Sequence, residues 1–273
     1  MTARLATHPD VASRTSEVLD RLSAAGIEVE FVEGGADPLH DVRDAKLDLA
    51  LVGIRALRGS AADGLTTVAV LPRGEFRDVL VSLSGAPMPL ADLPEGARVG
   101  VVGQRCLAFL RAHRPEVEPV VLESVAMIGE LQLDAAVLGS FEARQAGLGE
   151  ATAETLEPKA WLPEPGRGAL ALIARHPIAE ATALDHLPTR TALRAELSLL
   201  DALDASADAT LGALAQPSGR SIRLWAAAAS PDGRRLVRSD LTGPLDEPEA
   251  LGMAVARQLT ERGIGLVIAE SAP

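Results

Sequence analysis

Short apolar runs alternate with segments of helical periodicity in the first half of the chain, and the alternation occurs twice. The first series of predicted strands lies at residues 4–6, 27–32 and 47–52, and the second at 98–102, 117–122 and 134–138. Consecutive strands joined by helical crossovers pair in parallel, because a tight hairpin cannot join parallel neighbours. The sequence therefore predicts two α/β domains of similar design.

The pattern changes near residue 188. A predicted helix is followed by three strands, a second helix and a final strand, at 190–204, 209–216, 221–229, 234–241, 247–262 and 266–269. Pro231 and Asp232-Gly233 supply the turn that joins the second and third of these strands. This segment predicts a compact α+β domain.

Charge and composition exclude several classes of protein. The net charge of −12 argues against a nucleic-acid partner, which needs a basic surface to displace counterions. No apolar run is long enough to cross a membrane, and the N-terminal segment has no signal-peptide core, so we expect a cytoplasmic protein with no membrane partner. Cys106 is the one cysteine, and no clustered Cys and His residues predict a metal site.

Five short segments, met in order along the chain, carry a family resemblance. They read RLAT at 4–7, RDVLVS at 77–82, LPEGARVG at 93–100, LPEPGRGAL at 162–170 and SPDG at 230–233. Together they resemble segments of the hydroxymethylbilane synthases, also called porphobilinogen deaminases. Each segment alone is only moderately specific, but five in the same order identify the chain as a member of this family.

The resemblance implies an α/β fold of two periplasmic-binding-protein-like domains followed by a small α+β domain. We expect boundaries at residues 1–84 with 163–184, at 85–162 and at 185–273. Active members are implied to join four porphobilinogen molecules on a dipyrromethane cofactor, which a thioether attaches to a cysteine. An aspartate stabilises the charge on pyrrole nitrogen, while arginines and a lysine neutralise the carboxylates.

Two positions depart from the family pattern in ways that affect the chemistry. Ala56 stands where the family has its catalytic aspartate, and a methyl group cannot stabilise a cationic intermediate. Ala207 stands where the family has its cofactor cysteine, and a thioether requires a sulfur nucleophile. We therefore expect no catalytic residue, no covalent dipyrromethane at Ala207 and no cofactor.

The remaining candidate site residues are polar groups at the family's ligand-binding positions. Arg55 keeps the charge of the lysine, and Arg105 is the one arginine retained of the two in the family's segment. His8 replaces an arginine after Thr7, and Ser124 lies in a segment from which both family arginines are missing. Bidentate arginine contacts hold carboxylates strongly, so we predict a weakened anion site. Each of these side chains could instead be an ordinary solvated group.

The sequence thus predicts a divergent, inactive member of a tetrapyrrole and haem biosynthesis lineage that retains a cleft for a small carboxylate or tetrapyrrole-related anion. Regulation of a pathway enzyme would be a further role, with the partner unidentified. One alternative is an active synthase whose dipyrromethane is noncovalent or displaced. Another is a small-anion binding protein unrelated to pyrroles.

Overall fold

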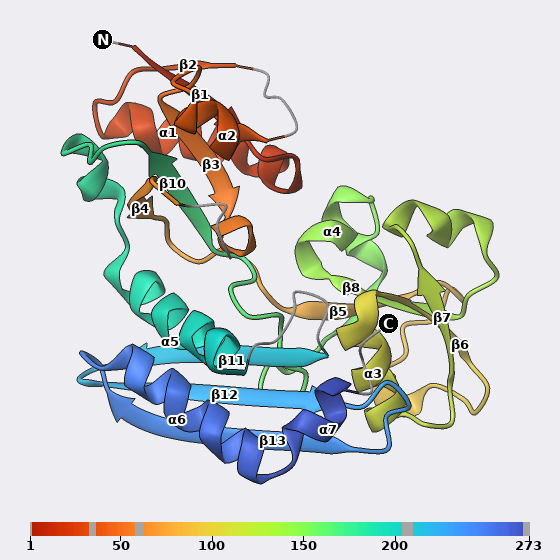
Figure 1. The fold of residues 1–273 in the computed structure, drawn as a ribbon. Helices are drawn as coiled ribbons and strands as arrows, with labels where there is room; N and C mark the ends of the chain where they lie inside the picture. Colours follow the sequence, from red (N-terminus) through yellow and green to blue (C-terminus); the bar gives the residue numbers. More distant parts are fainter. Residues whose placement is uncertain (1, 33–36, 58–62, 204–209, 270–273) are drawn as a thin grey trace. The chain divides into compact units, whose positions relative to one another are not determined.

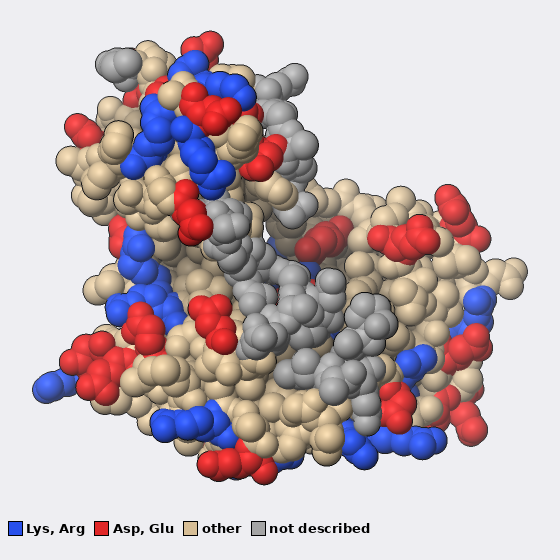
Figure 2. All heavy atoms as spheres, viewed as in Figure 1, with Lys and Arg blue, Asp and Glu red and all other residues tan. Residues whose placement is uncertain are grey.

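The computed structural model describes residues 2–32, 37–57, 63–203 and 210–269. The chain forms two compact units. Unit 1 comprises Met1–Gly74 with Gly166–Thr191, and unit 2 comprises Glu75–Pro165 with Ala192–Pro273. In the part of the chain described, no helix has the length and apolar character needed to span a membrane. On the face shown in Figure 2, basic and acidic side chains are interspersed, and no continuous basic surface is visible among the described residues.

Unit 1 is built on a five-stranded sheet in the order β2-β1-β3-β10-β4 (Figure 1). Its strands are β1 (Ala3–Thr7), β2 (Val29–Phe31), β3 (Leu49–Gly53), β4 (Thr66–Val70) and β10 (Leu170–Ala174). Its helices are η1 (Pro9–Arg14), α1 (Thr15–Ala24), α2 (Pro38–Arg43), η2 (Ile54–Leu57) and η7 (Glu180–Leu184). Strand β1 pairs in parallel with β2 and β3, as the crossover argument predicts, whereas β10 is antiparallel to β3 and β4.

The amphipathic pattern of α1 explains its packing on this sheet. Val18 and Leu22 lie one turn apart on the same face and are fully buried. They join a cluster that includes Leu5, Leu51 and Leu172 from three strands of the sheet. Burial of these apolar side chains is the main favourable contribution to the stability of unit 1.

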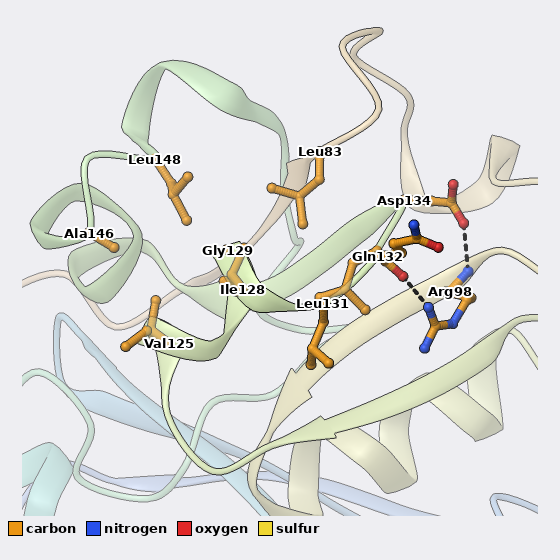
Figure 3. Close-up of a pocket in the computed structure, with 12 residues that line it drawn as sticks. Leu83, Arg98, Val125, Ile128, Gly129, Leu131, Gln132, Asp134, Ala146 and Leu148 are labelled. Carbon is orange, nitrogen blue, oxygen red and sulfur yellow. Dashed lines mark hydrogen bonds between the residues drawn. The ribbon is translucent and has the colours of Figure 1, made fainter.

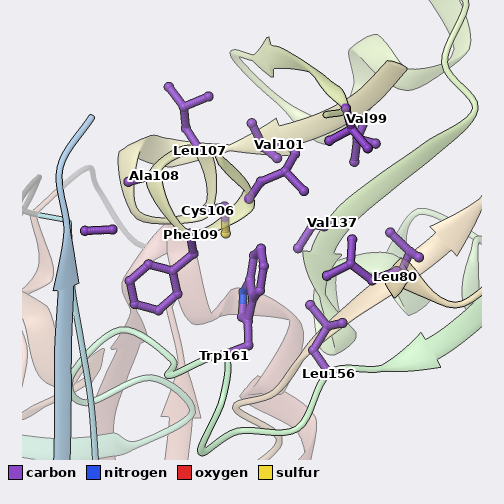
Figure 4. Packing of buried hydrophobic residues seen from close by; sticks show 14 of the residues in the cluster. Leu80, Val99, Val101, Cys106, Leu107, Ala108, Phe109, Val137, Leu156 and Trp161 are labelled. Atoms are coloured by element: carbon purple, nitrogen blue, oxygen red, sulfur yellow. The ribbon is translucent and has the colours of Figure 1, made fainter. Parts of the chain in front are cut away.

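Unit 2 contains a second five-stranded sheet, in the order β7-β6-β8-β5-β9. Its strands are β5 (Asp78–Ser82), β6 (Arg98–Val102), β7 (Glu118–Leu122), β8 (Ala135–Gly139) and β9 (Thr152–Thr155). Its helices are η4 (Leu90–Asp92), α3 (Gly103–His113), η5 (Val125–Glu130), α4 (Ser140–Gln145) and η6 (Gly149–Ala151). Helix α3 packs Leu107 and Phe109 onto the sheet beside Trp161 (Figure 4).

The same unit includes an antiparallel sheet in the order β11-β12-β13. These strands are β11 (Leu211–Ser218), β12 (Ser221–Ala229) and β13 (Leu236–Pro244), and the helices of this segment are α5 (Leu187–Leu203), α6 (Pro248–Glu261) and α7 (Ile264–Ala269). Leu199 of α5, Val255 of α6 and Leu224 of β12 share one buried cluster, so the helices cover one face of the sheet.

The predicted fold class of two α/β domains and a small α+β domain is confirmed, but some boundaries differ. Strand 78–82, assigned above to the domain ending at residue 84, pairs with β8 in the sheet of unit 2. The C-terminal sheet also belongs to unit 2. The predicted final strand at 266–269 is wrong, because this apolar run forms α7, and a short apolar run fits either structure.

Candidate functional site

The polar residues of unit 1 predicted to bind ligand gather at one edge of its sheet. Strands β1 and β3 are adjacent and parallel, with Thr7 opposite Leu51, so both strands end at the same edge. The His8 amide donates to the Leu51 carbonyl over 2.9 Å. Just beyond β3, Arg55 and Ala56 lie in η2. The structure therefore brings Thr7, His8 and the η2 backbone together, as expected from parallel strand order.

Thr7 is engaged by the fold. Its side chain is buried, and its Oγ1 lies 3.2 Å from Oγ1 of Thr15. The Thr15 hydroxyl lies 2.6 Å from the Ala12 carbonyl, which accepts its only proton. The Thr7 hydroxyl must then donate to Thr15, so its proton is used inside unit 1. Ala56 is half-buried, and of Arg55 the structure describes the backbone.

Arg105 and Ser124 belong to the corresponding edge of the sheet of unit 2. Strands β6 and β7 are parallel, with Val102 opposite Leu122, and each predicted residue follows one of these strands. Gly103 turns the chain from β6 into α3 with a φ of 80°, a conformation that glycine adopts without steric cost. Ser124 is exposed and precedes η5 without a side-chain capping bond.

Arg105 is the centre of a buried polar network. Its side chain is 3% exposed, and its Nη2 donates to Asp78 Oδ2 over 2.6 Å. Its Nη1 donates to the Leu162 carbonyl over 2.7 Å. Trp161 Nε1 donates to the same Asp78 oxygen over 3.0 Å. Burial alone would lower the pKa of Arg105, but the Asp78 carboxylate outweighs it and the pKa lies above its ordinary value.

This network links segments that carry the family resemblance. Asp78 comes from RDVLVS, and Leu162 from LPEPGRGAL, two segments far apart in the sequence. Arg105 acts between them as a positioning residue, while its role as a ligand contact stays a prediction. Sequence reasoning missed Asp78 and Trp161. The available signal was an acidic residue at the start of an otherwise apolar strand, since buried charges are normally paired.

Cys106 is held in the interior beside this network. It is 6% exposed and lies in the cluster that contains Phe109 and Trp161, whose rings meet edge to face (Figure 4). Arg105 Nη2 lies 3.3 Å from its Sγ. The thiol of the one cysteine in the sequence is therefore shielded from solvent. Ala207 lies outside the described residues, and among the described residues no group of three or more His, Cys, Asp and Glu is placed to hold a metal.

Comparison with known proteins supports the resemblance. Residues 15–183 match the family model described as "Porphobilinogen deaminase, dipyromethane cofactor binding domain". The chain is 35% identical to the porphobilinogen deaminase of Desulforudis audaxviator over 82% of this chain and 75% of the relative. It is 32% identical to that of Stenotrophomonas maltophilia (strain R551-3) over 93% and 86%. A periplasmic substrate-binding protein from Coxiella burnetii aligns with a TM-score of 0.47 at 14% identity, over 67% of this chain and 90% of that one.

The match corrects one expectation from the sequence. The expectation of no cofactor is wrong, because the matched family model is that of the dipyrromethane cofactor binding domain. The error came from treating the missing cysteine at position 207 as the loss of the whole binding site. The matched segment ends at residue 183 and does not include residue 207. A cofactor can be bound by a domain whose covalent anchor is absent, because noncovalent contacts contribute independently of the thioether.

Proposed function

The chain belongs to the porphobilinogen deaminase family, and we propose that it binds a dipyrromethane-class compound reversibly without condensing porphobilinogen. The observation that carries the proposal is Ala56, which follows β3 at the sheet edge where Thr7 and His8 also lie. Stabilisation of developing charge is commonly the largest catalytic contribution, and a methyl group provides none. Loss of that carboxylate removes turnover while leaving the neighbouring contacts in place.

Reversibility follows from the sulfur chemistry of the chain. Position 207 is alanine, and Cys106 is buried in the core of unit 2 beside Arg105. A thioether requires a thiol that its electrophile can reach. We therefore expect the compound to leave the protein when the protein is unfolded.

The carboxylates of the compound are assigned to unit 1 residues at the carboxyl edge of the sheet. We assign them to His8, which follows β1, and to Arg55 of η2, which retains the positive charge of the family lysine. When bound, a dipyrromethane supplies the pyrrole acceptor on which active members extend the chain. The residues of this protein bind and orient it, and no proton is moved to or from position 56.

Binding and turnover are tested separately on the full chain. The binding probe is a synthetic dipyrromethane with acetate and propionate substituents, added to the purified protein and measured by equilibrium dialysis. We expect saturable binding and an intact mass, after denaturation, equal to that of the bare polypeptide. A mass increase of two pyrrole units would contradict reversible binding, and an absence of saturable binding would contradict the proposed ligand.

Turnover is measured as consumption of porphobilinogen and formation of uroporphyrin after oxidation. The wild-type protein should consume none, whereas the variant Ala56→Asp with Ala207→Cys should acquire covalent pyrrole mass and measurable consumption. Ala56→Asn with Ala207→Ser is the matched control, because it restores polar groups of similar size without the charge or the sulfur. Consumption of porphobilinogen by the wild-type protein would overturn the proposed inactivity.

A further inference from the structure

A second candidate site lies at the end of the unit 2 sheet opposite Arg105. It is a pocket of about 990 Å³ beside the start of β6, where Arg98 lies, and beside Asp134, which precedes β8 (Figure 3). The crossover from β7 to β8 is formed by η5, a 3-10 helix of six residues. So short a helix covers the apolar face of the sheet incompletely, which leaves the pocket open.

The wall of this pocket is aliphatic. Leu83, Val125, Ile128 and Leu148 surround Gly129 and belong to, or pack against, the apolar cluster under the sheet (Figure 3). None of the described residues that line it is aromatic. Such a wall favours a branched or linear aliphatic group, whose burial is stabilised in proportion to the apolar area removed from water.

The rim of the pocket carries one cation and one anion. The Arg98 side chain donates to the Gln132 carbonyl, and its Nε lies 3.9 Å from Glu118. The Arg98 amide donates to Asp134 Oδ2 over 2.8 Å, which fixes the carboxylate beside the same residue (Figure 3). Asp134 forms no ion pair with any residue in the described part of the chain. The rim therefore presents both a guanidinium and a carboxylate next to an apolar wall.

From this charge pattern we propose that the pocket binds a free aliphatic α-amino acid of the leucine class. Its carboxylate would be recognised by those guanidinium N–H groups of Arg98 that Gln132 and Glu118 do not engage, and its ammonium group by Asp134. The side chain would lie against Leu83 and Leu148. The proposal concerns another end of the sheet and does not depend on dipyrromethane binding.

A ligand series tests the recognition of each group. L-leucine, 4-methylpentanoate, 3-methylbutylamine and L-alanine are titrated into the full chain and followed by calorimetry and by the amide signal of Gly129. We expect L-leucine to bind about tenfold more tightly than each of the other three, because each lacks one recognised group. Equal affinity for all four, or no saturable binding of L-leucine, would overturn the proposal.

Two glycine substitutions test the place of binding. A Cβ at Gly129 would meet no atom within 4 Å and the residue has no positive φ, so its backbone accepts a side chain, and Gly129→Leu is designed to place that side chain in the pocket that Gly129 lines. Gly265→Leu on α7 is the matched control, since its Cβ also meets no atom within 4 Å. We expect Gly129→Leu to weaken L-leucine binding by about tenfold or more and Gly265→Leu to leave it unchanged.

Two conservative variants then test the rim. Arg98→Gln should remove the preference for L-leucine over 3-methylbutylamine, and Asp134→Asn should remove its preference over 4-methylpentanoate. A loss of affinity that is the same for all ligands, or a loss caused equally by Gly265→Leu, would contradict recognition at this pocket. Melting temperatures of all the variants, measured without ligand, separate loss of binding from loss of folding.

Discussion

The two five-stranded sheets have the same strand topology and differ in the side chains at one equivalent buried position. Each has three parallel strands followed by an antiparallel strand and an edge strand, in the orders β2-β1-β3-β10-β4 and β7-β6-β8-β5-β9. In both sheets the antiparallel strand begins opposite the glycine that ends the third parallel strand. Leu170 pairs with Gly53 in unit 1, and Asp78 pairs with Gly139 in unit 2.

The corresponding residues have opposite chemistry. Leu170 is buried among apolar side chains, whereas Asp78 is buried in an ion pair with Arg105. In both units an arginine also donates a hydrogen bond to a backbone carbonyl of the 162–170 segment. Arg14 Nη1 donates to Gly168 over 3.1 Å, and Arg105 Nη1 donates to Leu162 over 2.7 Å. The topology therefore accepts either an apolar side chain or an ion pair at this position. In unit 2 the ion pair requires that both Asp78 and Arg105 be present.

The largest expected effect comes from breaking this ion pair. Arg105→Met removes the cation that pairs with the buried Asp78 carboxylate, which should destabilise unit 2 by about 3–5 kcal/mol. Both tryptophans, Trp161 and Trp225, lie in unit 2, so their fluorescence during urea unfolding of the full chain measures this unit.

The double variant Asp78→Leu with Arg105→Met is the control for this experiment. It gives unit 2 the apolar filling that Leu170 gives unit 1, and we expect it to recover most of the lost stability. A residual loss of about 1–2 kcal/mol is expected because Trp161 Nε1 loses its acceptor. Equal stability of the single and double variants would refute the structural role of the pair.

A smaller loss of stability should distinguish two glycines, one in each unit, that lie close to other atoms. A Cβ at Gly212 would lie 2.6 Å from the Leu162 carbonyl oxygen, a backbone atom, whereas one at Gly74 would lie 2.5 Å from Arg14 Nη1, the end of a flexible side chain. We expect Gly212→Ala to cost about 1–3 kcal/mol and Gly74→Ala about 1 kcal/mol or less. Amide hydrogen exchange in each unit measures both, and the reverse order would contradict the comparison.

The smallest effect concerns the ends of α1 and α3, the first crossover helices of the two sheets. The last turn of α1 carries Arg21, paired with Glu17, whereas α3 ends at His113, whose Nδ1 lies 2.8 Å from the Phe109 carbonyl and whose Nε2 lies 3.1 Å from Arg238 Nη2. Burial, together with the charge of Arg238, lowers the pKa of His113 below its ordinary value.

This lowered pKa gives a sign for the pH dependence of unit 2. The contribution of neutral His113 is complete above its ordinary pKa of about 6.5 and is lost as the pH falls below it, because the unfolded chain then binds the proton more readily. The ring is partly exposed, so the change should stay below about 1 kcal/mol. Urea unfolding at pH 7.5 and 5.5 should show this loss in the wild-type protein and not in His113→Gln.

Local patterns predicted most of the fold but not the strands whose sheet partners are distant in the sequence. The parallel core of each sheet follows from apolar runs separated by crossovers, and the C-terminal hairpin follows from its turn residues. Strands β9 and β10 were missed. Strand β10 is a continuous apolar run between β3 and β4 in space, and its partners are far away in the sequence. No local pattern specifies such pairing.

The candidate site was predicted in parts for the same reason. Strand order places Thr7, His8 and η2 at one edge, because these follow adjacent parallel strands. The partners of Arg105 could not be predicted, since Asp78 and Leu162 come from other segments and their contact depends on the returning chain. The sequence shows that Arg105 is charged, while only the structure shows that its guanidinium is paired with Asp78 inside unit 2.

The position of β10 has a consequence for synthesis on the ribosome. Strand β4 pairs with β10, and β10 alone separates it from β3. During translation β4 therefore stays unpaired until the first segment of unit 2, Glu75–Pro165, has been synthesised. Closure of such a distant contact is slow compared with local pairing. The nascent protein thus passes through a stage in which the edge of β4 that pairs with β10 is exposed. We expect a chaperone to prevent aggregation chiefly at this stage.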